Sequence, residues 1–301
     1  MEDMTIEIRH LSKCYGKKQA LKDINLTIEQ GMFGLLGRNG AGKTTLMKTL
    51  ATLLQKKEGS ITLCGIPVEN AKEVRKIIGY LPQDFSMYPS MRVVDAMDYL
   101  GVLSGIETAE RKKRIEQLLV QVNLLEHKDK KVRSLSGGMK RRLGIAQALL
   151  NQPKVLIVDE PTAGLDPEER IRFRNLLCEV AEERIVILST HIVGDIEATC
   201  ETIGILNEGI LLYKGTVEQL LKKAEGKVFS MAADKRELPK LKKEFHITGM
   251  HAQGSKVHIR FLSETPVYGA QRCEPNIEDA YLLYLSENGV PLMEISAGGE
   301  Q

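Results

Sequence analysis

Short apolar runs alternate with stretches of helical spacing along most of the chain. Continuous apolar runs, which are typical of buried parallel strands, occur at residues 32–36, 155–158, 185–189 and 203–206. Helical periodicity follows the first three of these runs, at residues 45–51, 167–183 and 192–199. This alternation of strand and helix predicts an α/β domain built on a parallel sheet.

Other segments predict smaller structures around that sheet. Alternating strands are expected at residues 5–8 and 21–28, with a polar turn at 13–18 between them, and further strands at 59–65 and 77–81. The runs 203–206 and 210–213 flank a polar turn and predict a hairpin. Between residues 85 and 150 the spacing becomes helical at 93–103 and 109–122, and a third helix is expected to end at Leu150. This part of the chain is therefore predicted to form a helical subdomain.

The last part of the chain differs from the rest because it carries no phosphate-binding or acid–base motif. Strand-like pieces at 227–231 and 256–261 alternate with helix-like pieces near 235–244 and 278–287. We therefore predict two domains, an α/β domain over residues 1–215 and a small α+β accessory domain over residues 216–301.

Composition limits the possible functions. With 301 residues, of which 43% are hydrophobic, the chain can bury one large core and a smaller one. The 42 basic and 40 acidic residues give a net charge of +2, which argues against nucleic acid as the main partner. The cysteines lack metal-ligand spacing and are odd in number, so we expect reduced thiols in a cytosolic protein. They are Cys14, Cys64, Cys178, Cys200 and Cys273.

No segment of the sequence resembles a signal peptide or a membrane span. The start, Met1-Glu2-Asp3-Met4, is acidic and has no apolar signal region. No apolar run approaches the ~18 residues of a transmembrane helix. If the protein works at a membrane, we expect another chain to cross it.

The stretch from Gly37 to Thr45 fits the phosphate-binding pattern G-x-x-x-x-G-K-[ST]. Its glycines allow consecutive backbone N–H groups to turn toward an anion, and the following helix points its N-terminus at the same place. Lys43 supplies a positive charge for the outer phosphates, and the Thr44 hydroxyl is a suitable ligand for Mg²⁺. The alternative is a glycine-rich turn that matches the pattern by chance. The strand–loop–helix context argues against that alternative.

Two carboxylates, Asp159 and Glu160, directly follow the apolar run 155–158. At the carboxyl end of a parallel strand beside a phosphate loop, the first carboxylate is placed to hold Mg²⁺. The second can orient or deprotonate an attacking water. An acidic strand end at a surface turn is the alternative for these two residues taken alone.

A second anion site is suggested by Ser136-Gly137-Gly138 at the start of a helix. Ser136 can cap the helix, and the small residues let the backbone approach a phosphate. An ordinary N-cap explains this stretch equally well. One chain would thus carry two helix N-termini that bind phosphate. This suggests that a second copy supplies one of the two to each nucleotide.

In this order the motifs resemble those of the nucleotide-binding subunit of an ATP-binding cassette (ABC) transporter, over about residues 4–215. The resemblance identifies 37–45 as Walker A, Gln83 as the Q-loop glutamine and 135–139 as the signature, with Met139 in place of the usual Gln. Residues 155–160 resemble Walker B, 163–166 the D-loop and His191 the switch histidine. The implied fold is a P-loop NTPase core with antiparallel β and α-helical subdomains.

The resemblance also implies roles for individual residues. Glu160, His191 and Gln83 would be catalytic, and Mg²⁺ would be held by Thr44, Gln83 and Asp159. Tyr15 would stack on adenine, although a lone aromatic residue more often only packs against its neighbours. Asp166 would contact the opposite subunit. The implied ATP-binding set is Tyr15, Gly37, Asn39, Gly40, Ala41, Gly42, Lys43, Thr44, Thr45, Ser136, Gly137, Gly138 and Asp166.

The family mechanism implies an ATPase in which each ATP lies between Walker A of one subunit and the signature of another. ATP binding and hydrolysis in this dimer would drive an integral-membrane permease from the cytoplasmic face of the membrane. The second subunit could be the same chain or a different one. No nucleic acid partner is expected.

The subtype and the alternatives follow from further stretches. Residues 75–83, 189–197 and 274–281 resemble bacterial ABC-2-type exporter ATPases. A soluble ABC ATPase acting on DNA or ribosomes is less favoured because residues 84–134 are too short for a long coiled coil and only one cassette is present. A non-hydrolysing regulatory module is disfavoured because Lys43, Asp159 and Glu160 are all in place.

Overall fold

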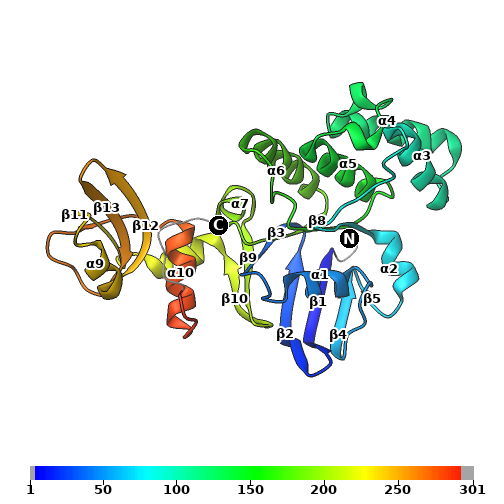
Figure 1. Ribbon diagram of the computed structural model, residues 1–301. Coiled ribbons are helices and arrows are strands. Elements are labelled where there is room, and N and C mark those ends of the chain that lie inside the picture. The colour runs from blue at the N-terminus through cyan, green and yellow to red at the C-terminus, as the bar shows by residue number, and fades with distance from the viewer. Residues whose placement is uncertain (1–3, 293–301) are drawn as a thin grey trace. The chain divides into compact units, whose positions relative to one another are not determined.

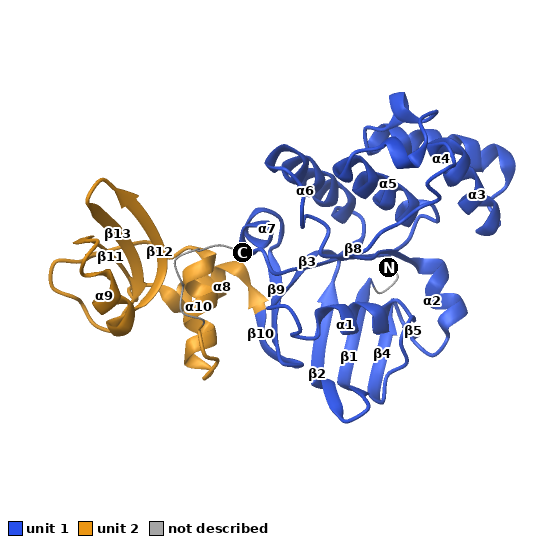
Figure 2. Ribbon diagram, in the orientation of Figure 1, with its two compact units in different colours: residues 1–214 blue, residues 215–301 orange. Residues whose placement is uncertain are grey.

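The chain forms two compact units, residues 1–214 and residues 215–301 (Figure 2). The structure, a computed structural model, describes residues 4–292. The predicted absence of a signal region therefore falls mostly outside the described residues. None of the helices within 4–292 combines the length and the apolarity that crossing a bilayer requires.

A six-stranded sheet forms the centre of the first unit (Figure 1). The strands with continuous apolar runs pair in parallel, β3 with both β8 and β9, and β7 with both β6 and β8, which confirms the predicted parallel sheet. All five residues of β7 are buried, as expected for a strand covered on both faces. In order across the sheet, the strands are β10 (Ile210–Thr216), β9 (Thr202–Asn207), β3 (Gly31–Leu36), β8 (Ile185–Thr190), β7 (Val155–Asp159) and β6 (Ile78–Leu81).

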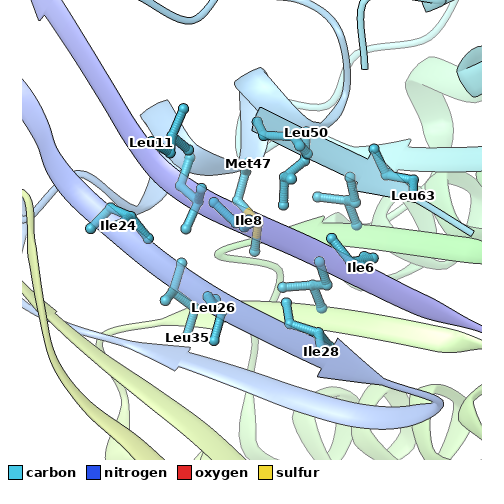
Figure 3. Packing of buried hydrophobic residues seen from close by; sticks show 14 of the residues in the cluster. Ile6, Ile8, Leu11, Ile24, Leu26, Ile28, Leu35, Met47, Leu50 and Leu63 are labelled. Atoms are coloured by element: carbon cyan, nitrogen blue, oxygen red, sulfur yellow. The ribbon is translucent and has the colours of Figure 1, made fainter. Parts of the chain in front are cut away.

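A second, antiparallel sheet of four strands lies beside helix α1 (Lys43–Leu50). Its two long strands extend further than expected, so the predicted polar turn at 13–18 is reduced to residues 16–17. They keep the alternating pattern, and their apolar side chains pack with Met47 and Leu50 of α1 into one buried cluster (Figure 3). The strand order is β2 (Lys18–Glu29), β1 (Thr5–Tyr15), β4 (Glu58–Leu63) and β5 (Ile66–Pro67).

Helices make up the rest of the first unit. The three predicted between residues 85 and 150 are present, and α6 and α7 follow strands β7 and β8 as the alternation indicated (Figure 1). A short helix, α2 (Ala71–Ile77), was not predicted, since Val74 is its only buried residue. The others are α3 (Val93–Leu103), α4 (Thr108–Gln121), α5 (Gly137–Leu149), α6 (Pro167–Ala181) and α7 (Val193–Thr199), with 3₁₀ turns at Leu125–His127 and Val132–Ser134.

The second unit is an α+β structure around an antiparallel sheet of order β12-β13-β11-β14. Phe229 and Phe261 stack with ring centroids 6.1 Å apart inside its own apolar core. A fully buried carboxylate, Asp279, pairs with Arg260 at 2.6 Å. The elements are α8 (Val217–Ala224), β11 (Val228–Asp234), α9 (Leu238–Glu244), β12 (His246–Gln253), β13 (Lys256–Leu262), β14 (Gln271–Arg272) and α10 (Ile277–Glu287).

Candidate functional site

A glycine-rich loop joins β3 to α1 and shapes the first part of the site. Gly40 and Gly42 have φ of +83° and +111°, in the left-handed region that side chains rarely enter. A Cβ on Gly42 would lie 2.8 Å from the backbone oxygen of Ala20. No side chain caps α1 at Gly42, so the N–H groups of its first turn are available to an anion. Thr44 and Thr45 lie in that first turn.

Lys43 is the first residue of α1, and its side chain is only 5% exposed. Its ammonium donates to the backbone oxygens of Gly37 at 2.6 Å and Arg38 at 3.3 Å, so the loop closes around it. It also lies 3.0 Å from Oε1 of Glu160. The structure thus brings together the phosphate loop and the acidic strand end, as the sequence predicted, and adds an ion pair that the sequence did not reveal.

Asp159 ends β7 and is fully buried. The Ser189 hydroxyl, from the neighbouring strand β8, donates to its Oδ1. Within residues 4–292, Oδ2 of Asp159 is buried and has no hydrogen-bond partner. A buried carboxylate oxygen left without a donor is costly unless a cation or a water satisfies it. The orphaned oxygen therefore fits a divalent cation held by Asp159.

Glu160 follows Asp159 and adopts an unusual backbone conformation, with φ of +48°. Its N–H donates to the backbone oxygen of Ser189 at 3.1 Å. Its carboxylate is buried, and Oε2 lies 2.5 Å from Nδ1 of His191. Glu160 consequently sits between a lysine on one side and a half-exposed histidine on the other. Strain at such a position is typical of functional sites.

Tyr80 of β6 is a neighbour of this cluster that the sequence analysis missed. It lies on the same sheet face as Asp159, because its strand partner is Ile157, two residues before Asp159 in β7. Its hydroxyl is buried without a hydrogen-bond partner among the described residues. Burial, and then the negative charge of Asp159, raise the pKa of Tyr80 to about 12. Its hydroxyl therefore stays protonated and can only act as a neutral donor or acceptor near neutral pH.

Gln83 and Tyr15 are among the predicted site residues that no hydrogen bond or ion pair within residues 4–292 joins to this cluster. Gln83 is exposed in the turn after β6, and Arg141 of α5 anchors that turn by donating to the Pro82 oxygen at 3.1 Å. Tyr15 is 48% exposed at the end of β1, and the ammonium of Lys13 lies 5.5 Å from its ring centroid. An exposed ring beside a strand turn can take a stacking partner.

The second glycine pair opens α5, as predicted. Ser136 is the N-cap and accepts from the Met139 N–H at 3.2 Å. Gly137 is exposed, with open space where a Cβ would project. A Cβ on Gly138 would instead meet the Glu169 carboxylate at 2.5 Å. Ser136 and Gly137 therefore form an exposed helix start.

Asp166, the last of the predicted residues, caps α6 by accepting from the Glu169 N–H at 2.9 Å. Glu169 in turn pairs with Arg142 of α5 at 3.2 Å. This ion pair connects the helix that begins after Ser136 with the helix that begins after Asp166. No recorded contact within 4–292 joins either helix start to the phosphate loop of the same chain.

Known proteins resemble this chain in sequence and in structure. The sequence profile of the family described as "ABC transporter" matches residues 21–163. "Uncharacterized ABC transporter ATP-binding protein sll0415" of Synechocystis sp. is 33% identical over 306 residues, 95% of this chain and 86% of that one. "Nod factor export ATP-binding protein I" of Cupriavidus pinatubonensis is 36% identical over 219 residues, 72% of this chain and 67% of that one.

Among solved structures, a similar one is the dimeric ATP-binding cassette MJ0796 in a post-hydrolysis state bound to ADP and Pi. It is 26% identical to this chain, with a TM-score of 0.63 over 70% of this chain and 98% of that one. The similarity confirms the predicted fold class of the nucleotide-binding core.

Proposed function

The chain belongs to the ATP-binding proteins of ABC transporters and is an ATPase, and we propose that it powers export through a separate integral-membrane permease. The exporter subtype is supported by the Nod factor export relative and by the resemblance of residues 75–83, 189–197 and 274–281 to ABC-2-type exporters. In this proposal residues 1–215 form the ATPase domain and 216–301 an accessory domain. The protein would act as a peripheral subunit at the cytoplasmic face of the membrane.

The contacts of Glu160 carry the proposal for catalysis. With Lys43 on Oε1 and His191 on Oε2, its carboxylate is held in one orientation and can accept a proton from an attacking water. Lys43 holds the outer phosphates, and His191 contacts the γ-phosphate region. Backbone N–H groups from residues 37–45 cradle the remaining phosphates, and Tyr15 stacks on adenine.

We assign the Mg²⁺ site to Thr44, Asp159 and Gln83. The orphaned Oδ2 of Asp159 supports its part in that site, and Ser189 fixes the other oxygen of the same carboxylate. When bound, Mg²⁺ neutralises charge on the transferring phosphoryl group. Gln83 would reach the site by movement of its exposed turn, which agrees with a role in sensing the permease.

A second subunit would complete each ATP site. The outward-facing helix start at Ser136, Gly137 and Gly138 is suited to bind the γ-phosphate of an ATP held by the other subunit. Asp166 would lie at the same subunit interface, because the Arg142–Glu169 pair connects α5 to α6. The solved relative bound to ADP and Pi is itself dimeric. The second subunit is either another copy of this chain or a related cassette.

Replacing Glu160 by Gln tests the catalytic part of the proposal. The amide keeps the volume but cannot accept a proton, so we expect turnover to fall by at least about 10²-fold. ATP binding should persist, and the ATP-bound dimer should accumulate, which light scattering would measure as an increase in molecular mass. Glu183→Gln, at an exposed position of the same chain, is the matched control and should hydrolyse ATP normally. Normal turnover in Glu160→Gln would remove that residue from its role.

Affinity capture tests the transport part. The Glu160→Gln variant, isolated with ATP from detergent-solubilised membranes and analysed by mass spectrometry, should retain a polytopic protein that lacks its own cassette. A Lys43→Ala variant in the same experiment should lose that partner together with ATP binding. Recovery of ribosomal or DNA-bound material without a membrane protein would instead favour a soluble ABC ATPase.

A further inference from the structure

A buried hydrogen bond links the two segments that follow the catalytic residues. Thr162 lies two residues after Glu160, and Asp195 lies four residues after His191. The Thr162 hydroxyl donates to Oδ2 of Asp195. Asp195 is fully buried and Thr162 is 1% exposed, so this contact is shielded from water. A charge-assisted bond in such surroundings is stronger and more directional than a surface bond.

Asp195 is also tied to the helices around it. The guanidinium of Arg174, from α6, lies 3.7 Å from Oδ1 of Asp195 and donates to the Gly194 oxygen at 3.2 Å. The Thr199 hydroxyl donates to the backbone oxygen of Asp195 at 2.7 Å, within α7. Through Asp195, therefore, the segment after Glu160 is connected to α7, which contains Asp195, and to α6, which packs against α7; both helices are labelled in Figure 1.

Sheet geometry explains why this bond bears on the catalytic pair. Strands β7 and β8 are neighbours, with Asp159 paired to Ser189 at their carboxyl ends. The two segments that leave these ends therefore run side by side. They touch first through Glu160 and His191, at 2.5 Å, and again through Thr162 and Asp195. The second contact fixes the spacing of the segments just beyond the first.

Stability alone is a weak reason for this arrangement. A buried ion pair is often no more stabilising than apolar side chains of the same volume, since both charges lose their hydration. Oδ1 of Asp195 in addition has no hydrogen bond among the described residues, and Arg174 at 3.7 Å is too far to supply one. The hydrogen bond between Thr162 and Asp195 does supply a fixed direction, because the single hydroxyl of Thr162 donates to one particular carboxylate oxygen.

We propose that Thr162 and Asp195 are positioning residues for ATP hydrolysis, which hold the Glu160 and His191 segments at the spacing that the Glu160–His191 contact requires. This inference rests on the proposed roles of Glu160 and His191 at the γ-phosphate. Both residues would act through Glu160 and His191, because no hydrogen bond or ion pair within residues 4–292 joins Thr162 or Asp195 to Lys43 or Asp159. The phosphate loop joins β3 to α1, so ATP binding there should not depend on Thr162 or Asp195.

The test compares steady-state ATPase kinetics of three variants. Thr162→Val keeps the shape but cannot donate, so kcat should fall about tenfold or more while KM stays within about twofold. Thr162→Ser restores the hydroxyl and should recover kcat to within about twofold of the starting protein. Asp195→Asn keeps the volume and an acceptor oxygen but loses the charge, and should lower kcat about threefold. This last variant carries the test if Thr162→Val does not fold.

A matched control separates positioning from general destabilisation. Thr199→Val also removes a hydroxyl that bonds to Asp195, but this bond stays within α7. It should also lower the melting temperature, but leave kcat unchanged. Equal losses of kcat in the two valine variants would overturn the proposal, as would a Thr162→Val enzyme with normal kcat.

A double-variant cycle identifies the route of the effect. In a His191→Ala background, Thr162→Val should change kcat by no more than about twofold, because the segment it positions no longer carries the histidine. A full further loss in that background would show that Thr162 does not act through His191. Normal hydrolysis by Glu160→Gln, in contrast, would contradict the proposed function itself and not this inference alone.

Discussion

Replacing Lys43 by Ala should destabilise the first unit before any nucleotide is added. The Lys43 ammonium and the Glu160 carboxylate lie 3.0 Å apart, and both side chains are 5% exposed. Removal of the lysine leaves a buried carboxylate whose remaining side-chain partner is His191. An unpaired buried charge is costly because the protein cannot replace the lost hydration.

The size of the effect follows from this geometry. At 3.0 Å and an effective dielectric constant near 20, the attraction amounts to about 5.5 kcal/mol. Part of it is offset by the desolvation of both ions, and truncating one partner of a buried pair typically costs about 3–5 kcal/mol. Since His191 still contacts Glu160, we expect the lower end, about 3 kcal/mol. For a unit of this size that loss lowers the melting temperature by about 6–12 °C.

Urea unfolding, with hydrogen exchange of the β7 and β8 amides to localise the change, measures this loss. Lys48→Ala is the control, since Lys48 lies on the same helix but is exposed, and it should cost no more than about 0.5 kcal/mol. Combining Lys43→Ala with Glu160→Gln removes the unpaired charge of Glu160 and should recover more than half of the lost free energy of unfolding. Equal stability of the two alanine variants, or no recovery in the combined variant, would refute the reasoning.

Three further predictions concern other parts of the chain. Gly42→Ala should destabilise the loop by at least about 1–2 kcal/mol, because φ is +111° there, and should weaken the binding of a fluorescent ATP analogue in titrations. Burial raises the pKa of Cys200 to about 12, whereas Cys178 is exposed, so iodoacetamide at pH 8 should modify Cys178 before Cys200, as mass spectrometry of timed samples would reveal. Arg260→Ala leaves the fully buried Asp279 without its cation and should cost about 3 kcal/mol, measured by hydrogen exchange of β13.

The strongest sequence patterns predicted their elements well because one force dominates each of them. Residues 155–158 are apolar at every position, and β7 is buried at every position. Helix α8 was missed although Thr216 and Gln219 form a capping box, a signal that can be recognised in sequence. Strand β12 was missed for a physical reason, since only Ile247 is buried in it and its register depends on its partner β13.

For the candidate site, the sequence located individual residues but not their contacts. It placed Lys43 in a phosphate loop and Glu160 at a strand end, and it gave no indication that the two side chains form an ion pair. Nor could it link Thr162 to Asp195, which are 33 residues apart. Both contacts depend on which strands are neighbours, and spacing along the chain does not contain that information.

The order of strands in the sheet determines which chemistry can converge. The phosphate loop leaves β3, the acidic pair ends β7 and the histidine follows β8, and β8 lies between the other two. Because all three strands are parallel, their carboxyl ends share one edge, where loops of different origin meet. Glu160 reaches Lys43 across β8 because its backbone turns at a φ of +48°, and Ser189 of β8 holds that turn by accepting the Glu160 N–H. The central strand thus acts as a spacer whose end also positions the base, so a change at Ser189 should alter Asp159 and Glu160 together.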